Sequence, residues 1–143
     1  MTGNNLKQRM RSGEILIGVS VPLNATLNQM EEIIHKDDYA FISTDSQHFA
    51  FNEETLVNFC QHAKKLDIPT QFRIKHTRET YLIGNILDLG PLGIEVPQVE
   101  DIDTVKEAVD YFYYPQKGLR SWGGVERYGI EEIPERLEYS DWW

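Results

Sequence analysis

A few polar and charged residues follow apolar runs of the chain at positions where they could do chemistry. Asp45 and His48 come directly after the second such run. Arg73 lies near the end of the third run, and Gln98 ends the fourth. A histidine can transfer a proton near neutral pH, and a fixed arginine can stabilise negative charge on an oxygen. If the runs are parallel strands, these side chains converge on one pocket at the strand ends.

Short apolar runs alternate with longer amphipathic segments, which is typical of an α/β protein. We expect strands at residues 15–21, 39–44, 70–74 and 93–99. We expect helices at residues 26–36, 53–66, 78–89 and 103–113. Asn52 is a good N-cap for the second of these helices. The lone cysteine, Cys60, falls on that helix's apolar stripe, which predicts a role in core packing.

The four strand–helix units show no hairpin signal, so we expect parallel strands with right-handed crossovers. The strands recur about every 25 to 30 residues, which suits a TIM barrel, (β/α)₈, as well as an open sheet. Residues 21–26, the first loop after a strand, lack the G-x-G-x-x-G of a dinucleotide site. A complete barrel takes about 250 residues. We therefore interpret residues 1–143 as a single domain that forms half of a barrel, either as a fragment or with its open edges covered by another chain.

The chain is acidic, with 23 Asp and Glu against 14 Lys and Arg and a net charge of −9 over 143 residues. Nucleic acids and anionic membranes bind through basic surfaces, so neither is an expected partner. No apolar run approaches the about 20 residues of a membrane helix, and residues 1–7 show no secretory signal. A single cysteine fits a reducing compartment. We therefore expect a cytoplasmic protein.

Four motifs occur in order along the chain. They are Asp45-Ser46-Gln47-His48, Phe72-Arg73-Ile74, residues 87–99, and Tyr114-Pro115-Gln116-Lys117-Gly118-Leu119-Arg120-Ser121. In order and spacing they resemble motifs in the N-terminal half of the HpcH/HpaI aldolase/citrate lyase family. That family includes the 2,4-dihydroxyhept-2-ene-1,7-dioate aldolases and the 2-keto-3-deoxy sugar-acid aldolases. The resemblance covers residues 6–129, which is most of the chain.

The resemblance implies an oligomeric (β/α)₈ barrel that acts on a carbon–carbon bond next to a 2-keto acid. Such a class II aldolase uses a divalent metal (Mg²⁺, Mn²⁺ or Co²⁺), and its retro-aldol reaction gives pyruvate and an aldehyde. By this resemblance His48 is the general base, Asp45 orients it, and Arg73 holds pyruvate or its enolate oxygen. The residues expected to bind the substrate are Arg73, Gln98, Gln47 and Arg120.

The chain departs from the family pattern in two places. Gln47 stands where the family has a glutamate. Its amide can hydrogen-bond a metal-bound water but cannot accept a proton. The family's two metal-binding carboxylates lie on strands five and six, beyond the four strands expected here. We therefore expect no complete metal site within these residues.

The same residues also have purely structural interpretations. His48 could be a surface histidine, and Arg73 could form a salt bridge to a helix carboxylate. Glu95, a charge in the fourth strand, is expected to form a structural pair, with Lys75 as a partner, outside the site. For the whole chain, the alternative function is a non-catalytic half-barrel that assembles with another chain as a binding or structural module. Cleavage of an acyl-CoA ester on the same scaffold ranks lower.

Overall fold

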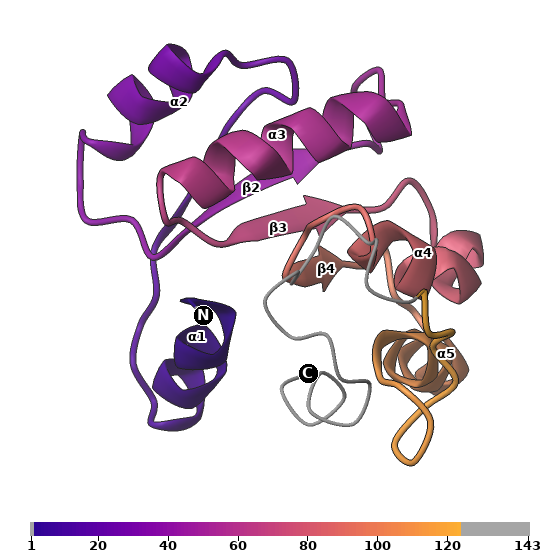
Figure 1. Ribbon diagram of the computed structural model, residues 1–143. Helices are drawn as coiled ribbons and strands as arrows, with labels where there is room; N and C mark the ends of the chain where they lie inside the picture. Colours follow the sequence, from indigo (N-terminus) through magenta and orange to yellow (C-terminus); the bar gives the residue numbers. More distant parts are fainter. Residues whose placement is uncertain (1, 124–143) are drawn as a thin grey trace.

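A parallel sheet lies at the centre of the structure, a computed structural model that describes residues 2–123 (Figure 1). Its strands are β1 (Gly18–Ser20), β2 (Phe41–Asp45), β3 (Thr70–Arg73) and β4 (Gly93–Glu95). They lie side by side in chain order, and each neighbouring pair is parallel. This arrangement confirms the expected α/β architecture and corresponds to part of a (β/α)₈ barrel.

The paired strands are shorter than the apolar runs that predict them. Ile15 and Ile17 are exposed and precede Gly18, where pairing with β2 begins. Within the described residues, β1 and β4 each pair with one neighbour only. A strand at a sheet edge leaves a row of backbone groups unpaired. Both edges of this sheet are therefore open in the part of the chain that the structure describes.

Helical segments flank the strands. They are α1 (Thr2–Arg11), α2 (Leu27–Ile34), α3 (Glu53–Lys65), the 3₁₀ helix η1 (Thr77–Leu82), α4 (Ile83–Leu87) and α5 (Ile102–Phe112). The side chains of Thr26, Asn52 and Asp101 begin α2, α3 and α5 by accepting hydrogen bonds from backbone N–H groups of the first turn. Thr26 and Gln29 complete a capping box. Nowhere in residues 2–123 is a helix long and apolar enough to cross a membrane.

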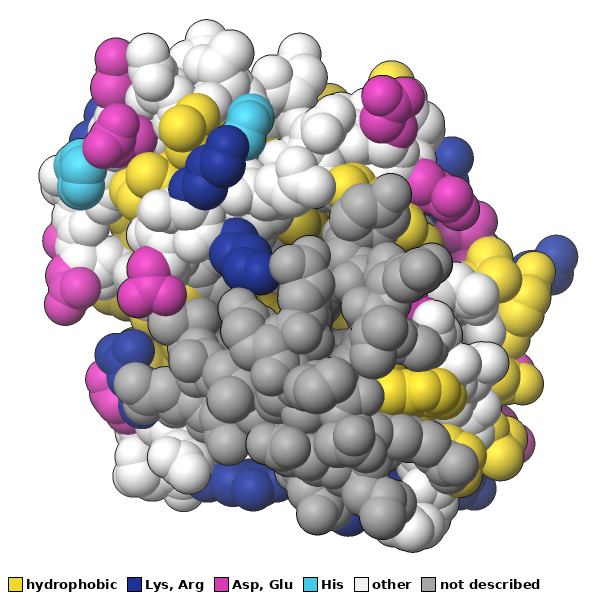
Figure 2. Space-filling model, viewed as in Figure 1, with side chains coloured by type: hydrophobic (Ala, Val, Ile, Leu, Met, Phe, Trp, Pro, Cys, Tyr) yellow, Lys and Arg dark blue, Asp and Glu magenta, His cyan; other side chains and the backbone are white. Residues whose placement is uncertain are grey.

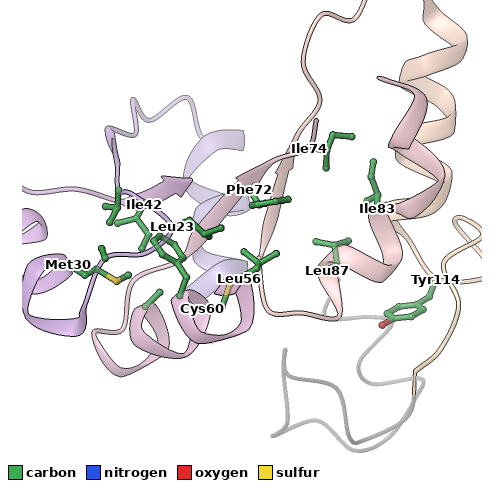
Figure 3. Packing of buried hydrophobic residues seen from close by; sticks show 14 residues of the cluster. Leu23, Met30, Ile42, Leu56, Cys60, Phe72, Ile74, Ile83, Leu87 and Tyr114 are labelled. Carbon is green, nitrogen blue, oxygen red and sulfur yellow. The ribbon is translucent and has the colours of Figure 1, made fainter. Parts of the chain in front are cut away.

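The hydrophobic core lies between the sheet and α3, which runs over β2 and β3 (Figures 1 and 3). Ile42 and Phe72 of the sheet pack with Leu56 and Phe59 of α3, and all four are almost fully buried. Cys60 is buried on the same stripe, which confirms its expected packing role. Burial raises the pKa of its thiol to about 12. Apolar burial of this kind is the main force that holds α3 on the sheet.

Two segments differ from the expected helices. The sequence pattern does not predict α1, because Leu6 and Met10 are its large apolar side chains and no stripe forms. The single helix expected at 78–89 is instead η1 followed by α4. The His76 side chain caps η1, and the Thr80 hydroxyl donates to the carbonyl three residues before it. These local bonds favour the tighter 3₁₀ pairing at the start of the segment.

The apolar face of α5 is more exposed than its periodicity predicts. Val105 and Val109 are 42% and 46% exposed, while Ala108 and Phe112 pack against the core. An apolar groove of about 370 Å³ runs between α5 and β4, with Ile94 and the two exposed valines among its lining residues. Figure 2 shows hydrophobic side chains gathered on the side of the molecule where α5 lies. We call this surface the α5 groove.

Candidate active site

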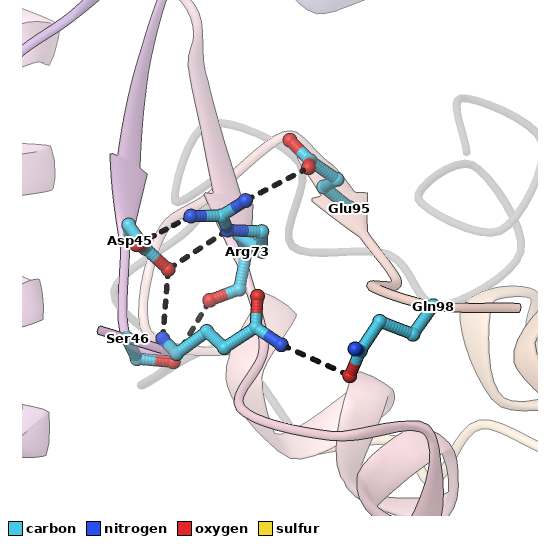
Figure 4. Close-up of polar contacts among 6 residues, drawn as sticks. Asp45, Ser46, Arg73, Glu95 and Gln98 are labelled. Atoms are coloured by element: carbon cyan, nitrogen blue, oxygen red, sulfur yellow. Dashed lines mark hydrogen bonds and ion pairs between the residues drawn. The ribbon is translucent and has the colours of Figure 1, made fainter. Parts of the chain in front are cut away.

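The last residues of β2, β3 and β4 form a row across the carboxyl edge of the sheet (Figure 4). Asp45 is in register with Arg73, and Arg73 is in register with Glu95. Side chains alternate between the two faces of a strand. Because Phe72 is buried against α3, its neighbour Arg73 and the rest of the row lie on the opposite face. The parallel register therefore brings three charged side chains together; we call them the strand-end row.

Asp45 and Arg73 are joined by two parallel hydrogen bonds. Arg73 Nε donates to Asp45 Oδ1 at 2.9 Å, and Nη2 donates to Oδ2 at 2.5 Å. The backbone N–H of Gln47 also donates to Oδ1, at 2.7 Å. The hydrogen bond from Arg73 is the main reason that the pKa of Asp45 is lowered, and the same bond raises the pKa of Arg73. The pair is therefore ionised at neutral pH and holds the guanidinium in a fixed orientation.

Glu95 lies on the side of Arg73 opposite to Asp45. Its Oε1 lies 3.7 Å from Arg73 Nη1, which is an ion pair but too long for a hydrogen bond. The structure thus corrects two expectations, since Glu95 pairs with Arg73 rather than Lys75, and the partners of Arg73 are strand carboxylates rather than a helix carboxylate. A charged residue within an apolar strand was the available signal, but the sequence alone does not identify its partner.

The loops that follow the strands are tied to this edge by further hydrogen bonds. Gln47 Nε2 donates to Gln98 Oε1 at 3.3 Å, which joins the loops after β2 and β4. Gln98 adopts a left-handed backbone with φ of 51°. The Ser46 hydroxyl and backbone N–H both donate to the carbonyl of Arg73, at 2.8 and 3.1 Å. The structure therefore brings Gln47 and Gln98 beside the strand-end row, and Ser46 was not foreseen as part of it.

His48 lies in the loop after β2, at the same edge of the sheet, and its side chain is exposed. The hydrogen bonds that Asp45 makes within residues 2–123 go to Arg73 and Gln47, and not to His48. The charge of His48 is a minor cause of the lowered pKa of Asp45. The structure thus places His48 near the row, but Asp45 orients Arg73 where it was expected to orient His48.

A cavity of about 540 Å³ opens beside the row, between the ends of β1 and β2. Asp45 is one of its lining residues, so the cavity and the strand-end row share a side chain. Ser20 and Asn24 add polar groups on the β1 side, and Phe49 and Phe51 add apolar surface. A concave space with a few polar groups in mostly apolar walls is typical of a small-molecule site.

Arg120 lies apart from the strand-end row. Its side chain is 0% exposed, its Nη2 donates to Asp88 Oδ1 at 2.6 Å, and its guanidinium lies 4.6 Å from the ring centre of Tyr114. Asp88 is the C-cap of α4, and the chain then reaches the start of β4, where the Leu92 N–H donates to the carbonyl of Thr70 at the start of β3. Arg120 is therefore at the opposite edge of the sheet, without exposed surface for a substrate, and it joins the segment after α5 to α4.

Residues 2–123 contain no group of three or more His, Cys, Asp or Glu side chains that could hold a metal ion. Asp45 uses both carboxylate oxygens to bind Arg73. A divalent metal such as Mg²⁺ needs several oxygen ligands that are free to coordinate it. The donor set of the strand-end row therefore does not fit a metal ion by itself.

Proteins of known function resemble the chain at low sequence identity. A 2-keto-3-deoxy-L-rhamnonate aldolase of Escherichia coli is 27% identical over 135 residues, which cover 87% of this chain and 49% of the relative. The aldolase of the same name from Shigella sonnei is 26% identical over 135 residues, with the same shares. The chain thus spans about half the length of the curated relatives it matches. No family model matches the chain.

Solved structures share the fold. An HpcH/HpaI aldolase from Desulfitobacterium hafniense superposes with a TM-score of 0.75 at 22% identity, covering 96% of this chain and 51% of that one. An HpcH/HpaI aldolase/citrate lyase family protein from Burkholderia cenocepacia gives 0.75 at 22% identity, with 96% and 55% covered. The citrate synthase SbnG gives 0.72 at 29% identity, with 95% and 50% covered. The four-stranded sheet therefore corresponds to about half of the fold of these proteins.

Proposed function

Because the chain is related to the HpcH/HpaI aldolases in sequence and fold over about half of their length, we propose that it is the part of a carbon–carbon lyase that binds a 2-keto acid. The proposed reaction is retro-aldol cleavage of a 4-hydroxy-2-keto acid to pyruvate and an aldehyde. The observation that carries the proposal is the strand-end row, which fixes an arginine at the carboxyl edge of a parallel sheet. Active sites of (β/α)₈ barrels lie at this edge.

The proposed role of Arg73 is to bind oxygen atoms of the 2-keto acid. Retro-aldol cleavage removes the proton of the 4-hydroxyl group and breaks the bond between the third and fourth carbons. The electron pair of that bond moves into an enolate of pyruvate, and the aldehyde leaves. The enolate oxygen carries the new negative charge, and a guanidinium that is already oriented stabilises it without reorganisation. Asp45 keeps Arg73 in that orientation through the two parallel hydrogen bonds.

The proposed role of His48 is to accept the proton of the 4-hydroxyl group and to return a proton to the methylene carbon of the enolate, which gives pyruvate. Its exposed imidazole stands at the same edge, and an imidazole can accept and return a proton near neutral pH. The cavity beside Asp45, at about 540 Å³, offers space for the aldehyde fragment. Gln47 and Gln98, which are hydrogen-bonded to each other, border the site on the other side. We leave Arg120 out of the site because it is fully buried elsewhere.

The resemblance also implies a divalent metal, which would act as a Lewis acid on the keto acid. The described residues do not provide a ligand set for it, so the roles of Arg73 and His48 are stated without a metal-dependent step. The lone, buried Cys60 agrees with a protein of a reducing cytoplasm.

Exchange of the methyl protons of pyruvate tests this function without an aldehyde. The full gene product is incubated with pyruvate and Mg²⁺ or Mn²⁺ in deuterium oxide, and loss of the methyl signal is followed by proton NMR. We expect exchange by the wild type and a loss of about 10²- to 10⁴-fold in His48→Ala. The matched control is His35→Ala, since His35 is also exposed but ends α2. Equal exchange by His48→Ala and the wild type would show that His48 does not move the proton.

A second candidate function is a non-catalytic half-barrel that assembles with another chain. The open edges at β1 and β4 and the α5 groove favour it. The same NMR assay separates the two candidates, because a structural module does not exchange pyruvate protons at any metal concentration.

A further inference from the structure

Arg73 lies between two carboxylates that engage it unequally. Asp45 accepts hydrogen bonds from Nε and Nη2 of Arg73. Oε1 of Glu95 lies 3.7 Å from Nη1, which is an ion pair without a hydrogen bond. Within residues 2–123, Glu95 is the ion-pair partner that the structure gives to Nη1. The N–H groups of Nη1 are therefore the donors of Arg73 best placed to receive an oxygen atom of a bound ligand.

We propose that Glu95 is a specificity-determining residue, whose carboxylate competes with the carboxylate or enolate of a 2-keto acid for Nη1 of Arg73. This inference rests on the proposed function, in which Arg73 binds the keto acid. Glu95 does not take part in bond cleavage. It sets how strongly an anionic ligand binds, and it disfavours anions that cannot displace it.

The charges of the strand-end row support this competition. One guanidinium stands between two carboxylates, so the three side chains together carry a net charge of −1. An anionic substrate approaching Nη1 is repelled by Glu95 until that side chain turns away. Removing the Glu95 charge leaves Asp45 and Arg73 as a neutral pair, with Nη1 of Arg73 still on the side that faces residue 95 (Figure 4).

The solvent exposure of the two carboxylates shows which of them can move away from Arg73. The Glu95 side chain is 47% exposed at the end of β4, an edge strand within the described residues. The Asp45 side chain is 12% exposed and accepts a third hydrogen bond from the backbone of Gln47. Glu95 can therefore rotate into solvent at little cost, whereas Asp45 cannot leave Arg73 without losing several charge-assisted hydrogen bonds.

The test compares Glu95→Gln with the wild type in the pyruvate exchange assay. Gln has the same shape without the charge, so we expect the KM for pyruvate to fall about five- to tenfold. This is the effect of one unit charge about 4 Å away when bulk water screens it, as it does for a side chain that is 47% exposed. We expect kcat to change less than about twofold, because Glu95 does not touch the reacting atoms. In the wild type, added salt should lower KM by screening Glu95, and this dependence should be weaker in Glu95→Gln.

Two control variants separate this role from a structural one. Glu95→Asp keeps the charge and should keep a KM close to that of the wild type. Glu31→Gln removes a charge from the exposed surface of α2, which is far from Arg73 in the sequence and is not part of the sheet. This variant should leave KM unchanged. An unchanged or higher KM in Glu95→Gln would overturn the inference, and so would an equal shift of KM in Glu31→Gln. In either case, exchange by the wild type would still support the proposed function. Absence of exchange by the wild type would overturn both.

Discussion

The pair of hydrogen bonds between Asp45 and Arg73 links folding to pH. The pKa of Asp45 is lowered in the folded chain, chiefly by the hydrogen bond from Arg73. A carboxyl group with a lowered folded-state pKa stabilises the fold at any pH above its unfolded value, about 3.9. That contribution is lost as the pH falls through the folded-state pKa. The same pair that fixes the orientation of the guanidinium thus also stabilises the sheet edge.

Asp45→Asn tests this link. We expect the free energy of unfolding at pH 7 to fall by about 1 kcal/mol, a modest value because Arg73 is partly exposed to solvent. The difference from the wild type should shrink towards zero well below pH 4, where Asp45 itself is protonated. Urea unfolding at both pH values measures it, with the exposed Asp38→Asn as a control. A loss of equal size at every pH would mean that the carboxylate charge is not the cause.

At the scale of single residues, the sequence predicts where a side chain lies in the fold better than it predicts which residue it bonds to. Asp45, His48 and Arg73 lie at one edge of the sheet, as parallel strands require. The hydrogen bond expected from Asp45 to His48 is replaced by two to Arg73, because the strand register sets Asp45 directly opposite Arg73. The burial of Arg120 also depends on contacts with Asp88 and Tyr114, which are distant in sequence and cannot be deduced from local spacing.

At the scale of helices and strands, elements with an N-cap and a clear apolar stripe were predicted well. α3 begins after Asn52 and buries the expected stripe, and α2 begins after Thr26. α1 has no stripe to reveal it, and apolar spacing does not distinguish a 3₁₀ turn from an α-helical one at η1. Strand ends were overestimated because pairing with a neighbour, and not hydrophobicity, decides where a strand begins and ends.

The turn after α4 depends on a glycine. Gly90 has a φ of 125°, and a Cβ atom added there would lie 2.6 Å from Cβ of Cys60 in α3. Gly13 also has a positive φ, 85°, but an added Cβ would meet nothing within 4 Å. Alanine substitutions at Gly13 and Gly90 therefore share the cost of a left-handed backbone. The substitution at Gly90 adds the cost of a steric clash with Cys60. The positive φ of Gly90 shows that the chain makes a left-handed turn at this point.

We expect Gly90→Ala to lower the free energy of unfolding by about 3 kcal/mol or more, and Gly13→Ala by about 1 to 2 kcal/mol from the left-handed backbone alone. Thermal unfolding of both variants measures the difference. A second readout is the Cys60 thiol, whose pKa of about 12 in the buried site makes it unreactive at pH 8. Its labelling should become faster in Gly90→Ala. Equal stability of the two variants would show that α3 moves aside without cost.

At the scale of the whole molecule, the described chain is a sheet with two open edges and an apolar groove beside one of them. Related proteins with this fold are about twice as long as the part that matches. Exposed strand edges and contiguous apolar surface favour pairing with another chain. We therefore expect residues 1–143, prepared alone, to be marginally stable or to self-associate.

Sedimentation velocity over about a hundredfold range of concentration tests this expectation, because association follows mass action. Larger species should dominate at high concentration and dissociate on dilution. Val109→Lys places a charge in the α5 groove and should shift the equilibrium towards the monomer. Glu31→Lys, an exposed change on α2, is the matched control. A monomer at every concentration with a sharp cooperative melt would contradict the expectation.

The shared register of Asp45, Arg73 and Glu95 also restricts which changes of chain length the protein can accept. Inserting or deleting one residue inside β3 would rotate every later side chain to the other face. Arg73 would then point into the apolar layer beneath α3, and a hydrophobic neighbour would replace it between the carboxylates. Length changes in the loops before the strands carry no such penalty. In a set of related genes, gaps should therefore collect between these strands, whereas the strands themselves should differ only by substitution.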